Sequence, residues 1–386
     1  MMLAVWAPLL LPFLAAPLAR RLAEALPPRA AAWMLAGSAT VLAGGTLCSL
    51  GLLAAAGLLQ LPPVAALGHL SLRWLTAAAP DAPLAAVAAA LALVALTALA
   101  VRTARRRRLE LRTVRAALPP GGQDDQHPDM RPPRVTVRRA RTPERFTTAP
   151  RPAGTARPAR RRPAGTVFTA LRRLADSAVP ALLHPAEPPL AVLDDERADA
   201  FALPGRLPRP GRPGEPGRIV VTSGMLRALS GPERSALLAH ERAHLVARHH
   251  VFLALAEHAA HVHPALRTLR APLGYHLERW ADEVAAARIG DRTVTARAVG
   301  RAALAASRSP WPDRPRLAPA AHAGPVPRRV AALLQPRPAP TRGARLRAVA
   351  LALAACLALS TGATLEATAD LHHTVEAAQQ GPGARH

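Results

Sequence analysis

The residues with the clearest chemistry are two histidines that flank a glutamate in the segment His240-Glu241-Arg242-Ala243-His244. On an α-helix, residues four positions apart lie on one face about one turn apart, so His240 and His244 can bind the same ion. Two imidazoles at this spacing with a carboxylate beside the first are typical of a zinc site whose glutamate is a general base. The spacing therefore predicts His240 and His244 as metal ligands and Glu241 as the catalytic residue.

The segment that carries these residues begins like a helix. Ser230-Gly231-Pro232-Glu233 has the Ser-x-x-Glu pattern of a capping box, and proline is tolerated in the first turn. No glycine or proline follows before Pro264, and large apolar residues recur along the segment. We therefore expect a mostly buried helix that presents the histidine pair and continues toward Pro264.

A zinc site also needs a third protein ligand and an open fourth position, and the sequence offers two candidates. Glu278 and Asp282 are four residues apart on one face of a second helix, which Gly290 would end. Glu278 would bind the metal, and Asp282 would accept the ring N–H of a ligand histidine, which we expect to be His240. The alternative ligand is His250, which completes H-E-x-x-H-x-x-x-x-x-H. That spacing needs a chain reversal at a glycine, and this chain has alanine there.

These two motifs carry a family resemblance. His-Glu-Arg-Ala-His at 240–244, followed by Glu-Arg-Trp-Ala-Asp at 278–282, resembles the gluzincin membrane proteases. The closest likeness is to the BlaR/MecR-type antibiotic-sensor peptidases, to which the HtpX-type and CAAX-prenyl proteases are related. Segments 198–205 and 218–226 look like the lead-in to the active-site helix in that group, so the resemblance covers about residues 190 to 300.

The composition favours helices and makes the chain strongly basic. Half of the 386 residues are hydrophobic, yet only 3% are aromatic, because the excess is mostly alanine and leucine. The formal net charge of +25 suits nucleic acid, an anionic membrane surface or the control of membrane topology. The two cysteines, Cys48 and Cys356, lie in apolar segments, so the sequence supports neither a disulfide framework nor a cysteine metal site.

Four apolar runs are long enough to cross a bilayer, and they cover residues 2–19, 31–59, 82–101 and 347–366. We take the first run as a retained transmembrane helix rather than a signal peptide, because its positive charges follow it. Arginines cluster after the first and third runs and before the fourth, whereas the loop at 60–81 has Arg73 alone. The positive-inside rule then predicts four crossings, with both termini outside and the histidine motif in the cytoplasm.

The expected fold class is mainly α: an integral membrane protein with four transmembrane helices and a cytoplasmic α+β gluzincin metalloprotease domain between helices three and four. The expected divisions are three transmembrane helices in 1–101, an Arg/Pro-rich disordered connector in 102–165, the zinc metalloprotease domain in 166–308, a Pro-rich linker in 309–346, the fourth transmembrane helix in 347–366 and a short extracytoplasmic tail in 367–386.

Inside the protease domain we expect a short amphipathic helix at 167–185. A small antiparallel sheet should follow, built from segments 190–193, 198–203 and 219–222, and its outer strand can pair with an extended substrate. Residues 309–343 are rich in proline, so we expect irregular structure there.

The resemblance implies a membrane-bound zinc metalloendopeptidase that hydrolyses a cytoplasmic protein, and the sensor peptidases cleave a transcriptional repressor. The expected cofactor is Zn²⁺ and the expected partners are that protein and the lipid bilayer. No penicillin-binding sensor domain is expected after the fourth run. An HtpX-like quality-control protease and a non-catalytic membrane scaffold stay open as alternatives. Nucleic-acid binding by 102–165 is disfavoured, since Phe146 is the one aromatic residue there. The sequence does not fix the oligomeric state.

Overall fold

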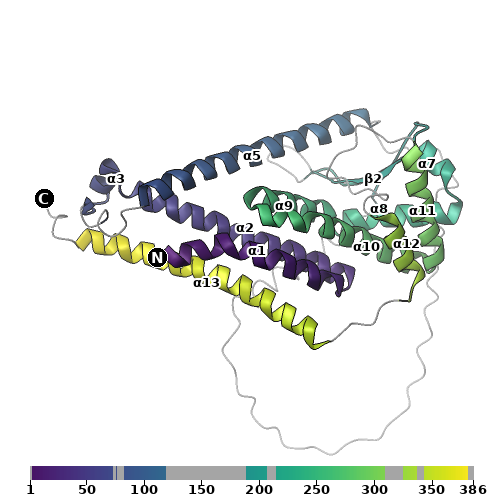
Figure 1. The fold of residues 1–386 in the computed structure, drawn as a ribbon. Helices are drawn as coiled ribbons and strands as arrows, with labels where there is room; N and C mark the ends of the chain where they lie inside the picture. The colour runs from purple at the N-terminus through teal and green to yellow at the C-terminus, as the bar shows by residue number, and fades with distance from the viewer. Residues whose placement is uncertain are drawn as a thin grey trace, which may run out of the picture. The chain divides into compact units, whose positions relative to one another are not determined.

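The structure, a computed structural model, describes residues 2–72, 75, 82–118, 188–206, 214–308, 325–336 and 343–380. Most of these residues are helical, and a three-stranded sheet lies among the helices of the second half of the chain (Figure 1). The predicted connector beyond residue 118 and the predicted amphipathic helix at 167–185 lie outside the described residues.

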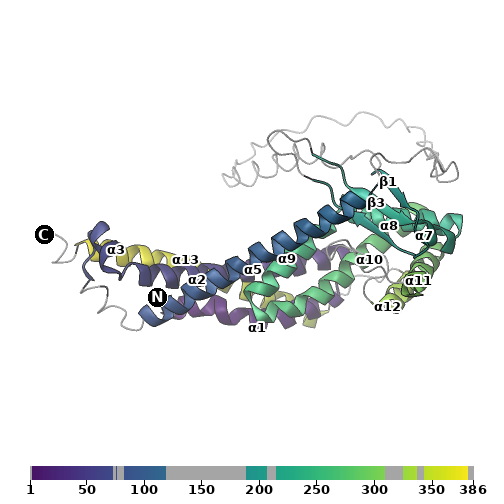
Figure 2. The ribbon, with the colours of Figure 1, turned by 90° about the horizontal axis from the view of Figure 1, so that it is seen from above.

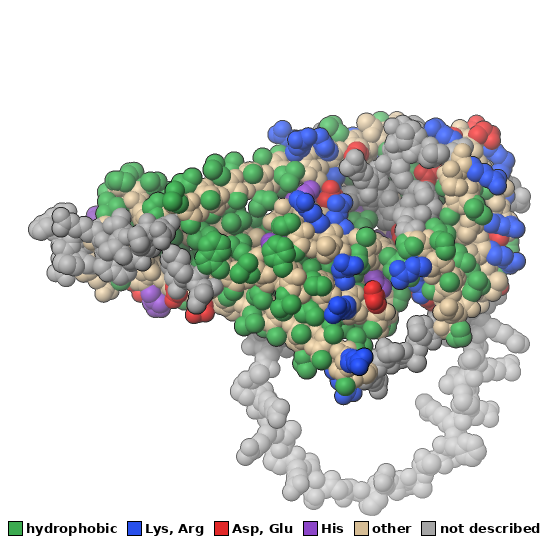
Figure 3. Space-filling model, in the orientation of Figure 1, with side chains coloured by type: hydrophobic (Ala, Val, Ile, Leu, Met, Phe, Trp, Pro, Cys, Tyr) green, Lys and Arg blue, Asp and Glu red, His purple; other side chains and the backbone are tan. Residues whose placement is uncertain are grey.

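Four helices are long and apolar enough to cross a membrane, which confirms by length and composition the four predicted spans. They are α1 (Met2–Glu24), α2 (Pro28–Leu58), α5 (Ala82–Ala117) and α13 (Ala344–Gln380). Their large apolar side chains are often exposed, as Leu84 (82%) and Leu351 (71%) illustrate. Apolar side chains also dominate the surface over α5 and α2 in Figure 3. A helix surface of this kind suits lipid rather than water.

All four helices continue beyond the predicted spans, and two of them do so by more than three turns. Residues 102–117, which we expected in the disordered connector, extend α5, and α13 runs to Gln380 although we expected a tail from residue 367. The prediction of disorder is wrong for 102–117 because this basic stretch has an apolar side. Leu111 and Val114 on that side pack against core residues of the sheet. Figure 2 shows the end of α5 beside β3. Arginine itself is also a good helix former.

Where α1 packs on α2, a side chain of α2 lies within hydrogen-bond distance of a backbone carbonyl of α1. Proline has no N–H, so Pro12 leaves the carbonyl oxygen of Pro8 without its usual donor inside the helix. The hydroxyl of Thr46 on α2 lies 3.2 Å from that oxygen and 3.0 Å from the carbonyl oxygen of Leu42, so its one hydrogen is shared between the two acceptors. A buried side chain thus satisfies a backbone acceptor that a bilayer cannot satisfy.

The sheet has the strand order β1-β3-β2, with β1 at Leu190–Leu193, β2 at Ala200–Leu203 and β3 at Arg218–Thr222. β2 pairs with β3 in antiparallel fashion, as expected, but β1 pairs with β3 in parallel. The prediction of a purely antiparallel sheet is therefore wrong. The chain reverses between β1 and β2 and again before β3, so β3 runs in the direction of β1 and lies between the two earlier strands.

The remaining helices are α3 (Pro62–Leu67), α7 (Ser223–Ala228), α8 (Gly231–Val246), α9 (His249–Val262), the 3₁₀-helix η2 (Pro264–Leu269), α10 (Arg270–Ile289), α11 (Arg292–Arg308) and α12 (Val326–Leu334). One large core joins α9, η2 and α10 to α1, α2 and α13. Buried leucines and alanines supply most of it, so the helices near the histidine motif pack directly on the candidate membrane helices.

The helix that carries the histidine pair is shorter than expected. α8 ends at Val246, and α9 begins at His249 after two residues of turn. Arg248 there adopts a left-handed conformation with φ of 53°, which is uncommon for a residue other than glycine. The sequence gives no glycine or proline to mark this break, so the expectation of one helix toward Pro264 is wrong.

We expected irregular structure over 309–343, but part of this segment is helical. Val326–Leu334 forms α12, whose Arg329 and Leu333 are fully buried. Leu333 joins a core formed with α10 and α11. Residues 309–324 and 337–342 lie outside the described part of the chain.

Candidate metal centre

Two helices present the predicted site residues. The capping box fixes the start of α8, as the sequence predicted. The carboxylate of Glu233 accepts the backbone N–H of Ser230 over 2.9 Å, and the side-chain oxygen of Ser230 accepts the backbone N–H of Glu233 in return. α10 ends at Ile289, followed by Gly290 with φ of 78°, also as predicted. α8 packs against α10 and brings the two motifs together.

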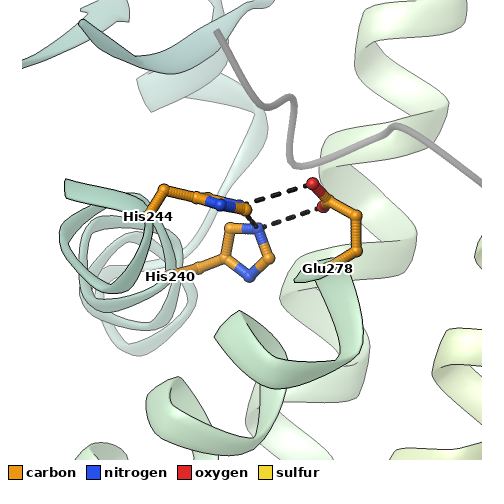
Figure 4. Close-up of side chains that lie close together, drawn as sticks. All are labelled: His240, His244 and Glu278. Carbon is orange, nitrogen blue, oxygen red and sulfur yellow. Dashed lines mark hydrogen bonds and ion pairs between the residues drawn. The ribbon is translucent and has the colours of Figure 1, made fainter. Parts of the chain in front are cut away.

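Three side chains converge between these helices, as Figure 4 shows. Nε2 of His240 lies 3.0 Å from Nε2 of His244, and each of these nitrogens lies 3.4 Å from an oxygen of Glu278. All three residues are buried. Within the described residues they form the group that is close enough to hold one metal ion, and His250 is not in it.

The spacing of these atoms fits a tetrahedral zinc site. Zinc binds imidazole nitrogen and carboxylate oxygen at about 2.0–2.2 Å, so two ligands on a tetrahedron lie about 3.3 Å apart. The observed separations of 3.0 and 3.4 Å bracket this value. A group of one glutamate and two histidines also leaves the fourth position for water or substrate, which is the arrangement of catalytic zinc sites.

In His240 and His244 the Nδ1 atom lies beside an acceptor, and the Nε2 atoms of the two rings face each other. Nδ1 of His240 lies 3.1 Å from Oδ1 of Asp282, and Nδ1 of His244 lies 2.6 Å from Nδ1 of His249. If each Nδ1 carries the proton, both Nε2 atoms are acceptors that face each other at 3.0 Å. A metal ion between the two nitrogens suits this tautomer, whereas without a metal a second proton on His240 can lie between them.

A buried arginine holds the carboxylates of this centre. Arg329 of α12 has no exposed surface, and its Nε and Nη2 donate to the two oxygens of Asp282 over 2.9 and 2.6 Å. Its Nη1 lies 3.0 Å from Oε2 of Glu278. The sequence analysis missed Arg329 because the proline content of 309–343 suggested irregular structure.

The charges of the centre also call for a divalent cation. Three carboxyl groups, those of Glu241, Glu278 and Asp282, are buried near the one buried guanidinium of Arg329. Uncompensated charge is expensive in a protein interior, so groups of this kind are paired or bind metals. A divalent cation on the two histidines would add positive charge where buried carboxyl groups outnumber buried guanidinium groups.

Ion pairing sets the protonation of these buried groups. Burial tends to lower the pKa of His240, but Asp282 and Glu278 outweigh it and raise this pKa to about 9 in the metal-free protein. Burial tends to raise the pKa of Asp282, but Arg329 and His240 lower it to about 2. The pKa of Arg329 rises above its usual value, since Glu278 and Asp282, with Glu241, outweigh burial. A metal must therefore displace a proton from His240 at neutral pH.

His249 is a second residue that the sequence analysis missed. It is fully buried, and its ring packs against Trp280 with centroids 4.8 Å apart. Burial, then the charges of His240 and His250, lower the pKa of His249 to about 3, so it stays neutral and can accept the N–H of His244. The break after α8 is what returns His249 to this position.

A comparison with family models supplies independent evidence on the chemistry. Residues 166–271 match Peptidase family M48. The M48 segment contains His240, Glu241 and His244 and ends before Glu278, so the part of the centre on α10 and α12 rests on the geometry. No curated protein and no solved structure matches the chain.

The M48 match supports a metallopeptidase hydrolase, and the four apolar helices are consistent with a multi-pass membrane protein. The roles of His240, His244 and Glu278 as ligands, of Glu241 as base and of Asp282 as the partner of His240 stay predictions that the distances support.

Proposed function

We propose that this protein is a membrane-bound zinc metalloendopeptidase that hydrolyses peptide bonds of a cytoplasmic protein. The observation that carries the proposal is the convergence of His240, His244 and Glu278 within the M48 segment and the helix that follows it. Zn²⁺ held by these residues supplies a Lewis acid for the peptide carbonyl and lowers the pKa of water toward about 7.

Glu241, Asp282 and Arg329 have different roles in this reaction. Glu241 follows His240 on α8 and has no exposed surface, so it can act as a base away from bulk water. It accepts a proton from the attacking water and returns it to the amine that leaves. Asp282 keeps the Nδ1 proton of His240 in place, and Arg329 keeps Asp282 in place.

The cytoplasmic side follows from the arginines at the ends of the apolar runs. In this orientation Arg29 at the start of α2 lies at the cytoplasmic boundary of the membrane, and its guanidinium lies over the ring of Trp280 at 5.5 Å. Trp280 contacts His249, which in turn contacts His244. The centre is thus three side-chain contacts from the membrane boundary, which favours substrates that reach the membrane surface.

This nearness to the membrane favours a second candidate role. An HtpX-like protease that degrades damaged membrane proteins also needs a site at the cytoplasmic surface. The sensor-type role predicts one preferred substrate, a transcriptional repressor, whereas the quality-control role predicts many. Proteomic comparison of membranes from cells with active and inactive enzyme would separate the two by the number of proteins that accumulate.

The test of the proteolytic role uses Glu241→Gln, which removes the base but keeps the size of the side chain. Purified wild-type protein with zinc should cut an unfolded protein such as casein, and Glu241→Gln should lose this activity while it keeps the metal. Glu196→Gln makes the same charge change at a side chain that is 87% exposed, and should cut normally. Normal cleavage by Glu241→Gln would show that the base is misassigned.

A further inference from the structure

The helix that follows the histidine pair packs against the candidate membrane helices along its whole length. α9 packs on α2, and η2 packs on α1, as Figure 1 shows for α9 beside these helices. Near the start of α9, the ring of Phe252 lies edge-on to that of Trp33 on α2, with centroids 4.8 Å apart. Just after the end of α9, Nε2 of His263 lies 3.0 Å from the carbonyl oxygen of Leu9 on α1. Both ends of α9 are therefore fixed on the membrane bundle.

These two contacts lie at different depths in the membrane. Trp33 is four residues after Arg29, which the proposed orientation places at the cytoplasmic boundary. Leu9 is ten residues before Ala19, the end of the apolar run of α1, so it lies about 15 Å inside that end. This is about half of the hydrocarbon thickness of a bilayer. α9 and η2, which we call the leaflet hairpin, therefore reach into the leaflet next to the metal centre.

Two arginines lie where the leaflet hairpin turns back into α10. Arg267 and Arg270 come four and seven residues after His263, and both are exposed. Nε of Arg267 donates to the carbonyl oxygen of Ala260 over 3.2 Å, which holds this side chain at the end of α9. Among the described residues, no carboxylate forms an ion pair with either arginine. A charge is expensive within a leaflet, so a long arginine side chain there reaches toward the phosphates of the headgroups.

A third arginine approaches the leaflet hairpin from α5. Arg107 is six residues beyond Val101, the end of the apolar run of α5, and thus about 9 Å past it. Headgroups occupy about 5–8 Å on each side of the hydrocarbon, so Arg107 lies at their outer edge. The charges of Arg107, Arg267 and Arg270 all act on His261 of α9. The three guanidinium groups therefore lie around one side chain at the membrane surface.

We propose that Arg107, Arg267 and Arg270 bind the phosphate of an anionic phospholipid, which holds the leaflet hairpin in the membrane. Glu257 pairs with Arg107, so three guanidinium groups and one carboxylate leave a net charge of +2. In Figure 3 basic side chains lie over α9, beside the apolar surface of the membrane helices. A guanidinium is a planar fork that matches two oxygens of a phosphate.

The bound lipid would also hold the metal centre at the membrane surface. α9 begins at His249, whose Nδ1 lies 2.6 Å from Nδ1 of the predicted ligand His244. The lipid site and the metal centre are thus at opposite ends of one helix of 14 residues. The proposal concerns lipid binding alone and does not depend on proteolysis.

The test counts the lipids that bind to the full-length protein in detergent, by native mass spectrometry. Phosphatidylglycerol and phosphatidylcholine are titrated separately into delipidated protein, and the first phosphatidylglycerol should bind about tenfold more tightly or better. An arginine near a membrane surface contributes about fivefold to the binding of an anionic lipid. Arg267→Gln with Arg270→Gln should therefore weaken phosphatidylglycerol about tenfold or more and leave phosphatidylcholine almost unchanged.

Two further variants complete the comparison. Arg270→Gln alone breaks no hydrogen bond or ion pair of the described residues, so it should fold normally and weaken phosphatidylglycerol about fivefold. Arg105→Gln with Arg106→Gln removes two exposed charges from the same level of α5 and should leave the first phosphatidylglycerol as tightly bound as in wild type. Thermal unfolding in detergent shows that each variant is folded.

Three results would overturn the proposal. They are equal affinity of wild type for the two lipids, unchanged affinity in folded Arg270→Gln, and an equal loss of affinity in the variant at Arg105 and Arg106. The last result would show a diffuse basic surface rather than a site. Glycerol 3-phosphate distinguishes a lipid site from a site for free phosphate esters. It should displace phosphatidylglycerol only at a large excess, and displacement at equal concentration would contradict the choice of a lipid.

Discussion

Replacement of Arg329 by methionine should destabilise the protein, and the loss of stability should be larger without bound metal than with it. The guanidinium is fully buried and makes three contacts, two to Asp282 and one to Glu278. Methionine has a similar length but no charge, so it leaves both carboxylates buried without this partner. Removal of one member of a buried ion pair typically costs about 3–5 kcal/mol.

The size of the effect should depend on whether zinc is bound. Without metal, the buried carboxylates of wild type face Arg329 and the protonated His240, and those of Arg329→Met face His240 alone. With zinc, two positive charges remain beside Glu278 in the variant. We therefore expect the chelated variant to melt at least about 6 °C below chelated wild type, since 1 kcal/mol shifts Tm by about 2–4 °C in a domain of 150–250 residues. Zinc should recover a large part of this difference.

The assay is thermal unfolding in detergent, with EDTA and with excess zinc, for wild type, Arg329→Met and Arg329→Lys. Lysine keeps the charge but not the fork, so it should lie between the other two. Arg328→Met is the control, because Arg328 lies beside Arg329 but stacks on Tyr275 at the surface side of α12. If chelated Arg329→Met melted with chelated wild type, the argument from buried charge would be refuted.

Four further predictions concern the helices and histidines around the centre. His249→Ala should weaken zinc binding about 10–100-fold and shift the visible spectrum of the cobalt form, because His244 loses its acceptor; His258→Ala, on the same helix, should not, and equal affinities in a metal titration would contradict the role of His249. Zinc uptake should release a proton at pH 7, seen by calorimetry in buffers of different ionisation enthalpy. The raised pKa of His240 stabilises the chelated protein below about pH 6.5, and this contribution should fade as pH rises through about 9; a chelated Tm independent of pH from 6 to 9.5 would count against it. Ser230→Ala should lower the free energy of unfolding by about 0.5–2 kcal/mol, because α8 loses half of its capping box, and a denaturant titration with unchanged midpoint would refute this.

Local patterns were sufficient to predict the parts of the structure that depend on neighbouring residues. The spacing of His240 and His244 and that of Glu278 and Asp282 define helix faces, and the structure brings both faces together. The helix caps at Ser230 and Gly290 were predictable for the same reason, because capping involves residues within one turn of the helix end.

The parts that sequence could not predict depend on tertiary contacts. Arg329 becomes part of the centre because α12 packs on α10 and α11, although prolines at 325, 327 and 336 surround it in the sequence. The break at Arg248 has no local signal, and the packing of His249 on Trp280 accompanies it. β1 pairs in parallel because β3 lies between β1 and β2 in the sheet. The alternation of apolar and polar residues along a strand does not encode the order of the strands.

The most direct test of the account is the metal content of detergent-purified protein, determined by mass spectrometry for wild type, Glu278→Ala and Glu283→Ala. Glu283 lies on the same helix but pairs with Arg279 and Arg292, so its variant controls for loss of a carboxylate from α10. We predict about one zinc per chain in wild type and Glu283→Ala, and little in Glu278→Ala. Wild-type protein without metal, under conditions that spare it, would contradict the metallopeptidase account, and full occupancy in Glu278→Ala would contradict the third ligand.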